Sequence, residues 1–425
     1  MKKNKQIILK RLAVTIGIVV FYQILSLIMI PGVNNSALAK VSQNSGLTML
    51  GMFSAGGFSQ YSLMSLGISS YITAQIVIQL LQSEVVPKFT QWSKEGKTGR
   101  EKLDKVTKVL ALILSITESI SITLGLNSMS DNKFVLDNNP FTYIVIGILL
   151  TAGSFIGVWL SDQITSKGLG SGVSVLIAGG IIAKFPNMIG ILGGILRINE
   201  KVNWAGIIEV IFMIIVAVFV IFWFSTSELR VPVQYAQRES ITGKQSYLPL
   251  KILIPGVMPI IFASQIFSIP QIILGFFKLS ERSTWHRLIT DIFNLQTGSG
   301  VILYGLLILF FTYLYSFVQM DPGKLAESFQ RLNAYIPGVY PGNPTSNYIV
   351  RILKKLAFPG GIFLVVISCL PLIIANNLTS TLQLGLSGSS ILIITGAIVE
   401  VSRQIKGLTM KQEYGSLLNN EFSLE

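Results

Sequence analysis

The chain has 425 residues, of which 51% are hydrophobic and only 12% are charged. Soluble domains carry about 25% charged residues, so this composition excludes an ordinary soluble protein and indicates one that lies in lipid. Apolar stretches long enough to cross a bilayer, about 20 residues, recur along the whole sequence. The net charge of +13 is compatible with nucleic acid binding, but in a membrane protein basic residues are first expected in cytoplasmic loops.

Ten membrane-spanning helices are predicted, and the second and fifth are expected to be short. The N-terminus is basic like that of a signal peptide, but its apolar part is too long and no small-x-small cleavage site follows, so we expect a retained first span. In chain order the spans are residues 12–30, 68–82, 106–126, 141–160, 172–186, 207–224, 252–274, 300–317, 357–375 and 388–402.

The distribution of basic residues predicts the orientation. Most of the 33 Lys and Arg residues fall in the N-terminus, the tail and the loops on the same side as both. The positive-inside rule therefore places both termini of this multi-pass protein in the cytoplasm. Ten spans divide into two sets of five, and a repeat with an odd number of spans must be inverted. We expect an N-terminal half at 1–200 and a C-terminal half at 201–425, with long basic cytoplasmic loops at 225–251 and 318–356 that form docking surfaces.

Catalytic chemistry finds little support in the sequence. His286 is the one histidine and falls in an expected external loop, and Cys369 is the one cysteine, so no catalytic residue, metal site or cofactor is predicted. Glu118 lies near the middle of the third span, where an ionisable group is costly. It either makes a polar contact with a neighbouring span or belongs to an ion-coupled transporter. A membrane-embedded enzyme such as an intramembrane protease is a further alternative, but it requires a Ser–His pair or paired membrane aspartates.

Several motifs occur in a fixed order along nearly the whole chain. They are LGISSYITAQIVIQLL at 66–81, KEG with the following GR at 94–100, WLSDQITSKGLGSGVSVLIAGGIIAKFP at 159–186, RVPVQYAQR at 230–238, PGVMPIIFAS at 255–264, DPGKLAESFQRLNAYIPGVYPGNPT at 321–345 and SGSSILIITGAIVE at 387–400. In these motifs the sequence resembles the SecY family, the channel subunits of bacterial protein translocases.

The resemblance implies a fold and a function. The fold is an all-α membrane protein with ten transmembrane helices in two inverted five-helix halves around a central pore. Unfolded preproteins cross the bacterial plasma membrane through that pore, and hydrophobic helices leave sideways into lipid between the second span and the seventh and eighth. A secondary transporter with inverted repeats is the alternative. Because no nucleotide-binding motif is present, energy must come from a partner or from the membrane potential.

The resemblance also assigns residues inside the channel. A pore ring of branched aliphatic side chains excludes water and binds no ions. Its members are Ile68, Ile72, Val173, Ile177, Ile261 and Ile393. A plug helix is expected at about 45–67, with Gly51, Phe53, Gly56 and Gly57 as its candidate residues, and the three glycines permit turns and close packing. Polar contacts across the lateral gate are expected from Gln75, Gln79, Glu118 and Gln265.

The cytoplasmic face is expected to dock a SecA-type motor ATPase or a ribosome, and SecE-like and SecG-like small subunits are the other implied partners. The docking candidates are Arg100, Arg230, Arg238, Lys244, Lys251, Lys324, Arg331, Tyr340, Arg351, Lys354 and Lys355. Tyr340 stands where the family's PGIRPG motif has arginine, and Ser70 stands where the second span usually has proline. These departures suggest an accessory SecY, with a housekeeping SecY as the alternative.

Overall fold

The fold is taken from a computed structural model, which describes residues 2–34, 61–82, 86–130, 133–137, 139–195, 197–198, 201–202, 204–235, 247–276, 289, 291–295, 297–377 and 388–421. Each of the ten expected spans coincides with one helix. These helices are α1 (Lys2–Ser26), α4 (Ser69–Leu80), α6 (Lys97–Met129), α7 (Pro140–Lys167), α8 (Gly172–Ile195), α9 (Trp204–Thr226), α10 (Met258–Phe276), α12 (Gly298–Gln319), α14 (Asn343–Asn377) and α15 (Gly388–Glu421).

Helix lengths confirm one expectation and correct another. Helix α4 is short, with 12 residues, as predicted. Helix α8 has 24 residues, so the prediction of a short fifth span was wrong. We ended that span at Pro186 because proline commonly ends or kinks a helix, but Pro186 lies inside α8 and the helix continues to Ile195. Among the described residues, five helical segments are long and apolar enough to cross a membrane by length and composition.

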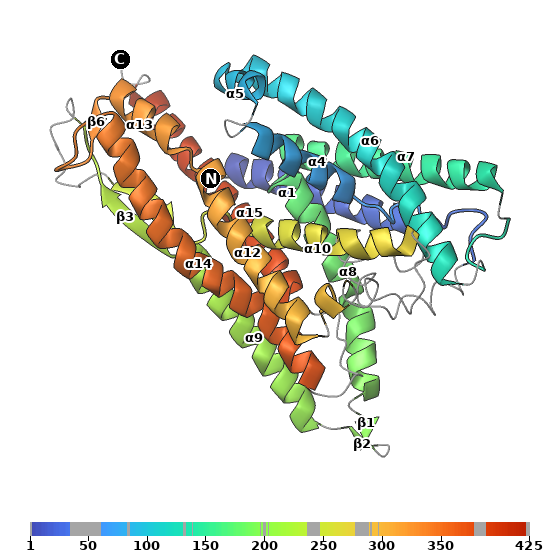
Figure 1. Cartoon of the computed structure of the whole chain (residues 1–425). Helices are drawn as coiled ribbons and strands as arrows, with labels where there is room; N and C mark the ends of the chain where they lie inside the picture. The colour runs from blue at the N-terminus through green and yellow to red at the C-terminus, as the bar shows by residue number, and fades with distance from the viewer. Residues whose placement is uncertain are drawn as a thin grey trace.

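The helices pack in two groups that follow the order of the sequence. Helices α4, α6 and α7 contact one another in the first group, and α12 contacts both α10 and α14 in the second. Figure 1 shows α10 between the two groups, and α10 contacts both α4 and α6. Helix α15 joins the groups a second time, because it contacts α8, which packs on α7 of the first group, and α14 of the second group.

The two loops expected as separate docking surfaces form one folded unit. Strands β3 (Glu228–Pro232) and β5 (Tyr247–Lys251) pair antiparallel within the first loop, with Arg230 opposite Pro249. Strand β4 (Gln234–Tyr235) pairs with β6 (Ala334–Tyr335) of the second loop, which also holds α13 (Pro322–Arg331). Val231, Leu250 and Phe329 belong to a small hydrophobic core shared by the two loops.

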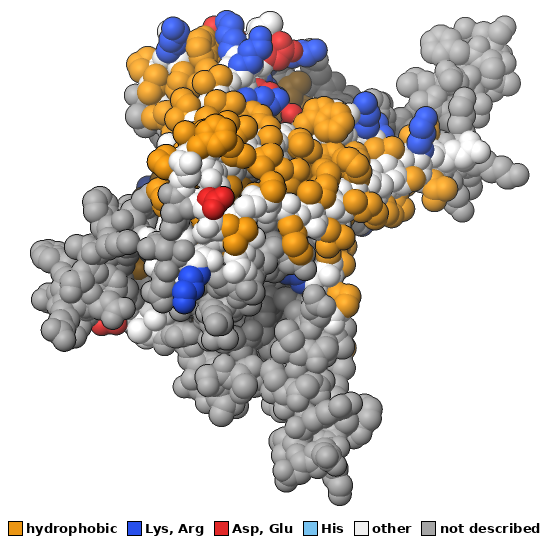
Figure 2. Space-filling view, turned by 90° about the vertical axis from the view of Figure 1, so that its right-hand side faces the viewer, with side chains coloured by type: hydrophobic (Ala, Val, Ile, Leu, Met, Phe, Trp, Pro, Cys, Tyr) orange, Lys and Arg blue, Asp and Glu red, His pale blue; other side chains and the backbone are white. Residues whose placement is uncertain are grey.

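This unit lies at the same end of the molecule as α5 (Pro87–Lys94), and a short hairpin of β1 (Arg197–Ile198) and β2 (Lys201–Val202) lies at the opposite end (Figure 1). Figure 2 shows hydrophobic side chains over a broad part of one face, with Lys and Arg gathered along its upper edge. Ile148 on α7 and Ile302 on α12 are 62% and 67% exposed, as expected of side chains that face lipid.

Candidate functional site

The six predicted pore-ring residues are all buried in the main hydrophobic core. They lie on four helices, with Ile68 and Ile72 at the start of α4, Val173 and Ile177 at the start of α8, Ile261 on α10 and Ile393 on α15. All six are at most 8% exposed and belong to one hydrophobic cluster. Branched aliphatic side chains from four helices are therefore buried in the same core, and a water-excluding constriction requires side chains of this kind.

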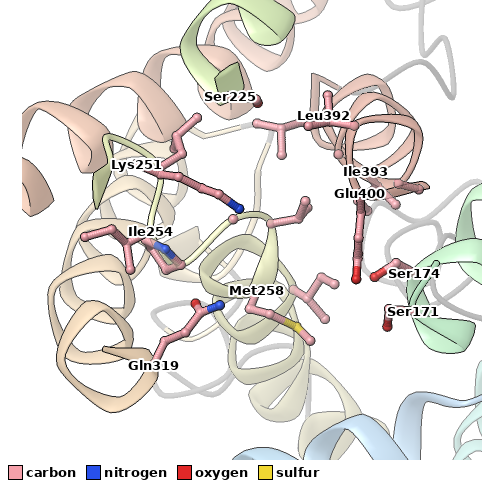
Figure 3. A pocket seen from close by; sticks show the side chains of 18 of the residues that line it. Ser171, Ser174, Ser225, Lys251, Ile254, Met258, Gln319, Leu392, Ile393 and Glu400 are labelled. Carbon is pink, nitrogen blue, oxygen red and sulfur yellow. The ribbon is translucent and has the colours of Figure 1, made fainter. Parts of the chain in front are cut away.

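A cavity of about 300 Å³ adjoins this cluster on the side of the β-strand unit. Ile261 and Ile393 line it together with charged and polar residues. Figure 3 shows Lys251 and Gln319 on one side of the cavity and Glu400 and Ser171 on the other. The cavity thus has charged or polar side chains on both sides, together with the apolar side chains of Ile261 and Ile393.

Polar side chains of α15 bond backbone groups of two neighbouring segments, the segment that precedes α8 and the end of α9. The Gly170 backbone N–H donates to Gln404 Oε1 at 2.7 Å, and Arg403 Nη2 donates to the Ser225 carbonyl oxygen at 2.8 Å. Gly170 has a φ of +90°, a conformation that favours glycine. The sequence analysis missed Arg403 and Gln404, because polar residues near the end of a span look like ordinary surface residues without the fold.

Glu118 makes the polar contact with a neighbouring helix that was one of its two predicted roles. Ser70 Oγ donates to one carboxylate oxygen at 2.6 Å, and Ser69 Oγ donates to the other at 3.3 Å. Both serines belong to α4, which packs against α6 in the first helix group. Ser70, the residue at the usual proline position, is therefore the closer partner of the buried carboxylate.

The other predicted gate residues lie where the two helix groups meet. The Gln79 side chain on α4 lies within hydrogen-bonding reach of the Tyr315 hydroxyl on α12. Gln79 Oε1 and Gln265 Nε2 are buried without a hydrogen-bond partner among the described residues, and Gln75 is partly buried on α4. The sequence analysis did not single out Tyr315, which supplies a contact between the two groups.

The docking candidates lie mostly on the surface of the β-strand unit and its neighbours. Arg230 stacks over the Tyr247 ring at 4.8 Å, and Lys324 Nζ donates to Ser93 Oγ of α5 at 2.9 Å. Tyr340 is 83% exposed. Lys251 is partly buried in the cavity wall, whereas the remaining described candidates are exposed: Arg100, Arg331, Arg351, Lys354 and Lys355.

Some predicted residues lie outside the described part of the chain. These are the plug residues Gly51, Phe53, Gly56 and Gly57 and the docking residues Arg238 and Lys244. Within the described residues, no cluster of His, Cys, Asp or Glu is placed to hold a metal ion.

Buried aliphatic side chains from four helices, next to a cavity lined partly by polar residues, are features expected of a membrane channel. Comparison with known proteins identifies the family, because the family model described as SecY matches residues 62–402. The chain belongs to the SecY family.

Two curated relatives come from the same organism, Lactobacillus kefiranofaciens subsp. kefiranofaciens, and are named SecY 1 and SecY 2. The chain is 54% identical to its protein translocase subunit SecY 2, covering 96% of this chain and 100% of the relative. Identity to its SecY 1 is 43%, with 97% of each chain covered. Among solved structures, Sec61 in the canine ribosome-channel complex from the endoplasmic reticulum has a TM-score of 0.65 at 16% identity, covering 95% of this chain and 93% of that one. This structure confirms the predicted fold.

The Ser70–Glu118 contact generates a test of stability. Ser70→Ala leaves the buried carboxylate with one weaker donor, and we expect a loss of about 1–3 kcal/mol in the free energy of unfolding. In a double-mutant cycle with Glu118→Gln, the coupling energy is expected to be about 0.6–2 kcal/mol. Thermal unfolding in detergent micelles measures both. Ser115→Ala is the control, because Ser115 bonds the Leu112 carbonyl of its own helix, and additive effects of Ser70→Ala and Glu118→Gln would contradict the contact.

Proposed function

We propose that this SecY-family chain conducts unfolded polypeptide across the bacterial plasma membrane through the ring of Ile68, Ile72, Val173, Ile177, Ile261 and Ile393. The observation that carries the proposal is the burial of these six side chains, from four helices, in one cluster beside a polar cavity. A channel for chains of any sequence has to seal without binding particular residues. Branched aliphatic side chains do this because they exclude water and offer ions no ligands.

The proposed orientation has both termini and the β-strand unit in the cytoplasm, as the positive-inside rule predicts. The cavity beside Ile261 and Ile393 is then the cytoplasmic entrance to the ring, and Lys251 and Glu400 lie in its wall. The segment 45–67 is proposed to close the ring from the outer side as a plug.

A lateral gate is proposed between α4 and the pair α10 and α12. Gln79 and Tyr315 approach each other across this boundary, and Gln265 lies buried on α10. Polar contacts between membrane helices contribute about 0.6–2 kcal/mol, which is small enough for an entering signal helix to replace. Gln75 and Glu118 lie on the α4–α6 side of the same gate.

Partners are proposed from the chemistry of the cytoplasmic face and from the relatives. SecE-like and SecG-like subunits complete the channel in the membrane, and a SecA-type motor or a ribosome docks on the β-strand unit. Tyr340 extends into solvent with 83% of its surface exposed and offers an aromatic side chain where SecY relatives use arginine. The higher identity to SecY 2 than to SecY 1 supports an accessory channel.

Crosslinking of a client in transit to the proposed ring tests the proposed function directly. A preprotein arrested in transit carries one cysteine in its translocating segment, and the channel carries Ile72→Cys or Ile261→Cys. Disulfide formation in native membranes is expected at both positions, because the ring surrounds the passing chain. Ile302→Cys on the exposed face of α12 is the control and is expected to stay uncrosslinked. The absence of crosslinks at both ring positions would overturn the pore assignment.

The proposed contact between Tyr340 and the motor can be tested by a binding measurement. An exposed aromatic side chain that anchors an interface costs about 2 kcal/mol when truncated, so Tyr340→Ala should weaken motor binding roughly 30-fold. Binding of purified SecA-type motors to the intact chain in nanodiscs measures this loss. Phe358→Ala on α14, which is equally aromatic and 68% exposed, is the control. Unchanged motor binding by Tyr340→Ala would exclude Tyr340 from the interface.

A further inference from the structure

The short segment that leads into α8, residues 168–172, is largely buried, and its backbone N–H groups need hydrogen-bond partners. Two of these groups donate to threonines of the N-terminal half. The Leu169 N–H donates to Thr15 Oγ1 of α1, and the Gly172 N–H donates to Thr165 Oγ1 of α7, each at 2.9 Å. The beginning of α8 is thus bound to the helices that precede it in the chain.

The two N–H groups between them meet α15 instead. The Gly170 N–H donates to Gln404 Oε1 at 2.7 Å, and the Ser171 N–H lies within hydrogen-bonding reach of the Glu400 carboxylate. Figure 3 shows the Glu400 side chain directed toward Ser171. Both acceptors belong to the C-terminal half of the chain, so this half holds the backbone from which a helix of the other half begins.

Glycines let the neighbouring helices approach this segment closely. Gly170 has a φ of +90°, and a Cβ atom at this position would lie 2.9 Å from Val401 Cγ2 of α15. A Cβ atom at Gly172 would overlap the Ser161 carbonyl oxygen of α7. The segment is therefore packed between α7 and α15, and it shifts when either helix moves relative to the other.

Two ring residues follow this segment directly. Val173 lies two positions after Ser171, and Ile177 lies one turn later on the same face of α8. Helix α15 carries the ring residue Ile393, and Glu400 and Gln404 lie about two and about three turns further along the same face. One face of α15 therefore supplies one ring residue and the acceptors for the backbone that precedes two others.

We propose that Gln404 and Glu400 are positioning residues of the pore ring, which place Val173 and Ile177 through the backbone of the segment before α8. The proposal rests on the proposed function. A displacement of α15 is then transmitted to two ring residues of the other half by hydrogen bonds to backbone, with no contact between the acceptors and the ring side chains. The ring closes correctly only when α15 and the start of α8 are in register.

Gln404 acts on position more than on overall stability. It is an exposed residue, so water can replace its amide oxygen when the side chain is removed, and the loss of stability is small. A replacing water satisfies the Gly170 N–H but does not attach it to α15. The loss of Gln404 therefore changes where α8 begins, while the buried hydrophobic core remains.

The ion leak of the idle channel in liposomes tests the effect on the ring. Gln404→Leu removes the acceptor and is expected to raise the leak about tenfold, whereas Gln404→Glu keeps an oxygen acceptor and should retain the unmodified level. Asn139→Leu is the matched control, because Asn139 is an exposed amide that accepts from the Phe141 backbone N–H at the start of α7. An unchanged leak in Gln404→Leu, or an equal increase in Gln404→Glu or Asn139→Leu, would overturn the proposal.

Thiol labelling tests whether the start of α8 itself moves. Val173 is 8% exposed, and Val173→Cys should react with a water-soluble maleimide about tenfold faster when Gln404→Leu is also present. Ile146→Cys is the control, because Ile146 is buried on α7 in a separate hydrophobic cluster and its labelling should not change. Gln404→Leu alone, whose Cys369 is buried, gives the background. Equal acceleration at both positions would indicate general loosening and would contradict a positioning role.

The two proposals fail in different ways, because neither the leak nor the labelling requires a client. Client crosslinks to Ile72→Cys together with an unchanged leak in Gln404→Leu would reject the positioning role and leave the channel function standing. Absent client crosslinks together with faster labelling of Val173→Cys would reject the channel function and would limit the role of Gln404 to the packing of α8.

Discussion

The proposed pore ring depends on six branched aliphatic side chains from four helices that are buried in one hydrophobic core. Four of the six ring residues lie at the start of α4 or α8. Their positions therefore depend on the two segments that precede these helices. The Tyr61 hydroxyl is hydrogen-bonded to Thr123 Oγ1 at 2.6 Å before α4, and the Leu169 backbone N–H donates to Thr15 Oγ1 at 2.9 Å before α8. These buried contacts fix the helix starts and therefore the ring.

The two places where the helix groups meet differ in their chemistry. On the side of α15, Gln404 and Arg403 bond backbone groups of the segments beside α8 and α9. On the gate side, the polar contacts are between side chains, such as Gln79 with Tyr315 and Lys324 with Ser93. A contact between two side chains can be replaced by a contact with a client when the side chains move. A contact to a backbone group is lost only when the helix or loop that carries this group moves. This difference favours opening at the gate while α15 keeps the two groups together.

The sequence predicted most of the fold, because apolar stretches of fixed length and ordered motifs carry that information. The six predicted ring residues are all buried, and their role in the pore stays a prediction. The sequence could not predict which polar side chains form hydrogen bonds with one another. Glu118 was recognised as a costly buried group, but its partner Ser70 became visible only when α4 lay against α6. The joined β-strand unit was also missed, since the pairing of Gln234 with Tyr335 connects residues far apart in the sequence. Pro186 misled the prediction because a proline in a continuous apolar stretch does not always end a helix.

The most direct test of the aliphatic seal is the ion leak of the idle channel in liposomes. Ile72→Ser and Ile261→Ser place hydroxyl groups in the constriction and admit water, so the leak should rise well above that of the unmodified channel. Ile302→Ser changes an exposed isoleucine of α12 in the same way and should leave the leak unchanged. A leak that stays at the unmodified level in both ring variants would contradict the ring as the seal of the channel.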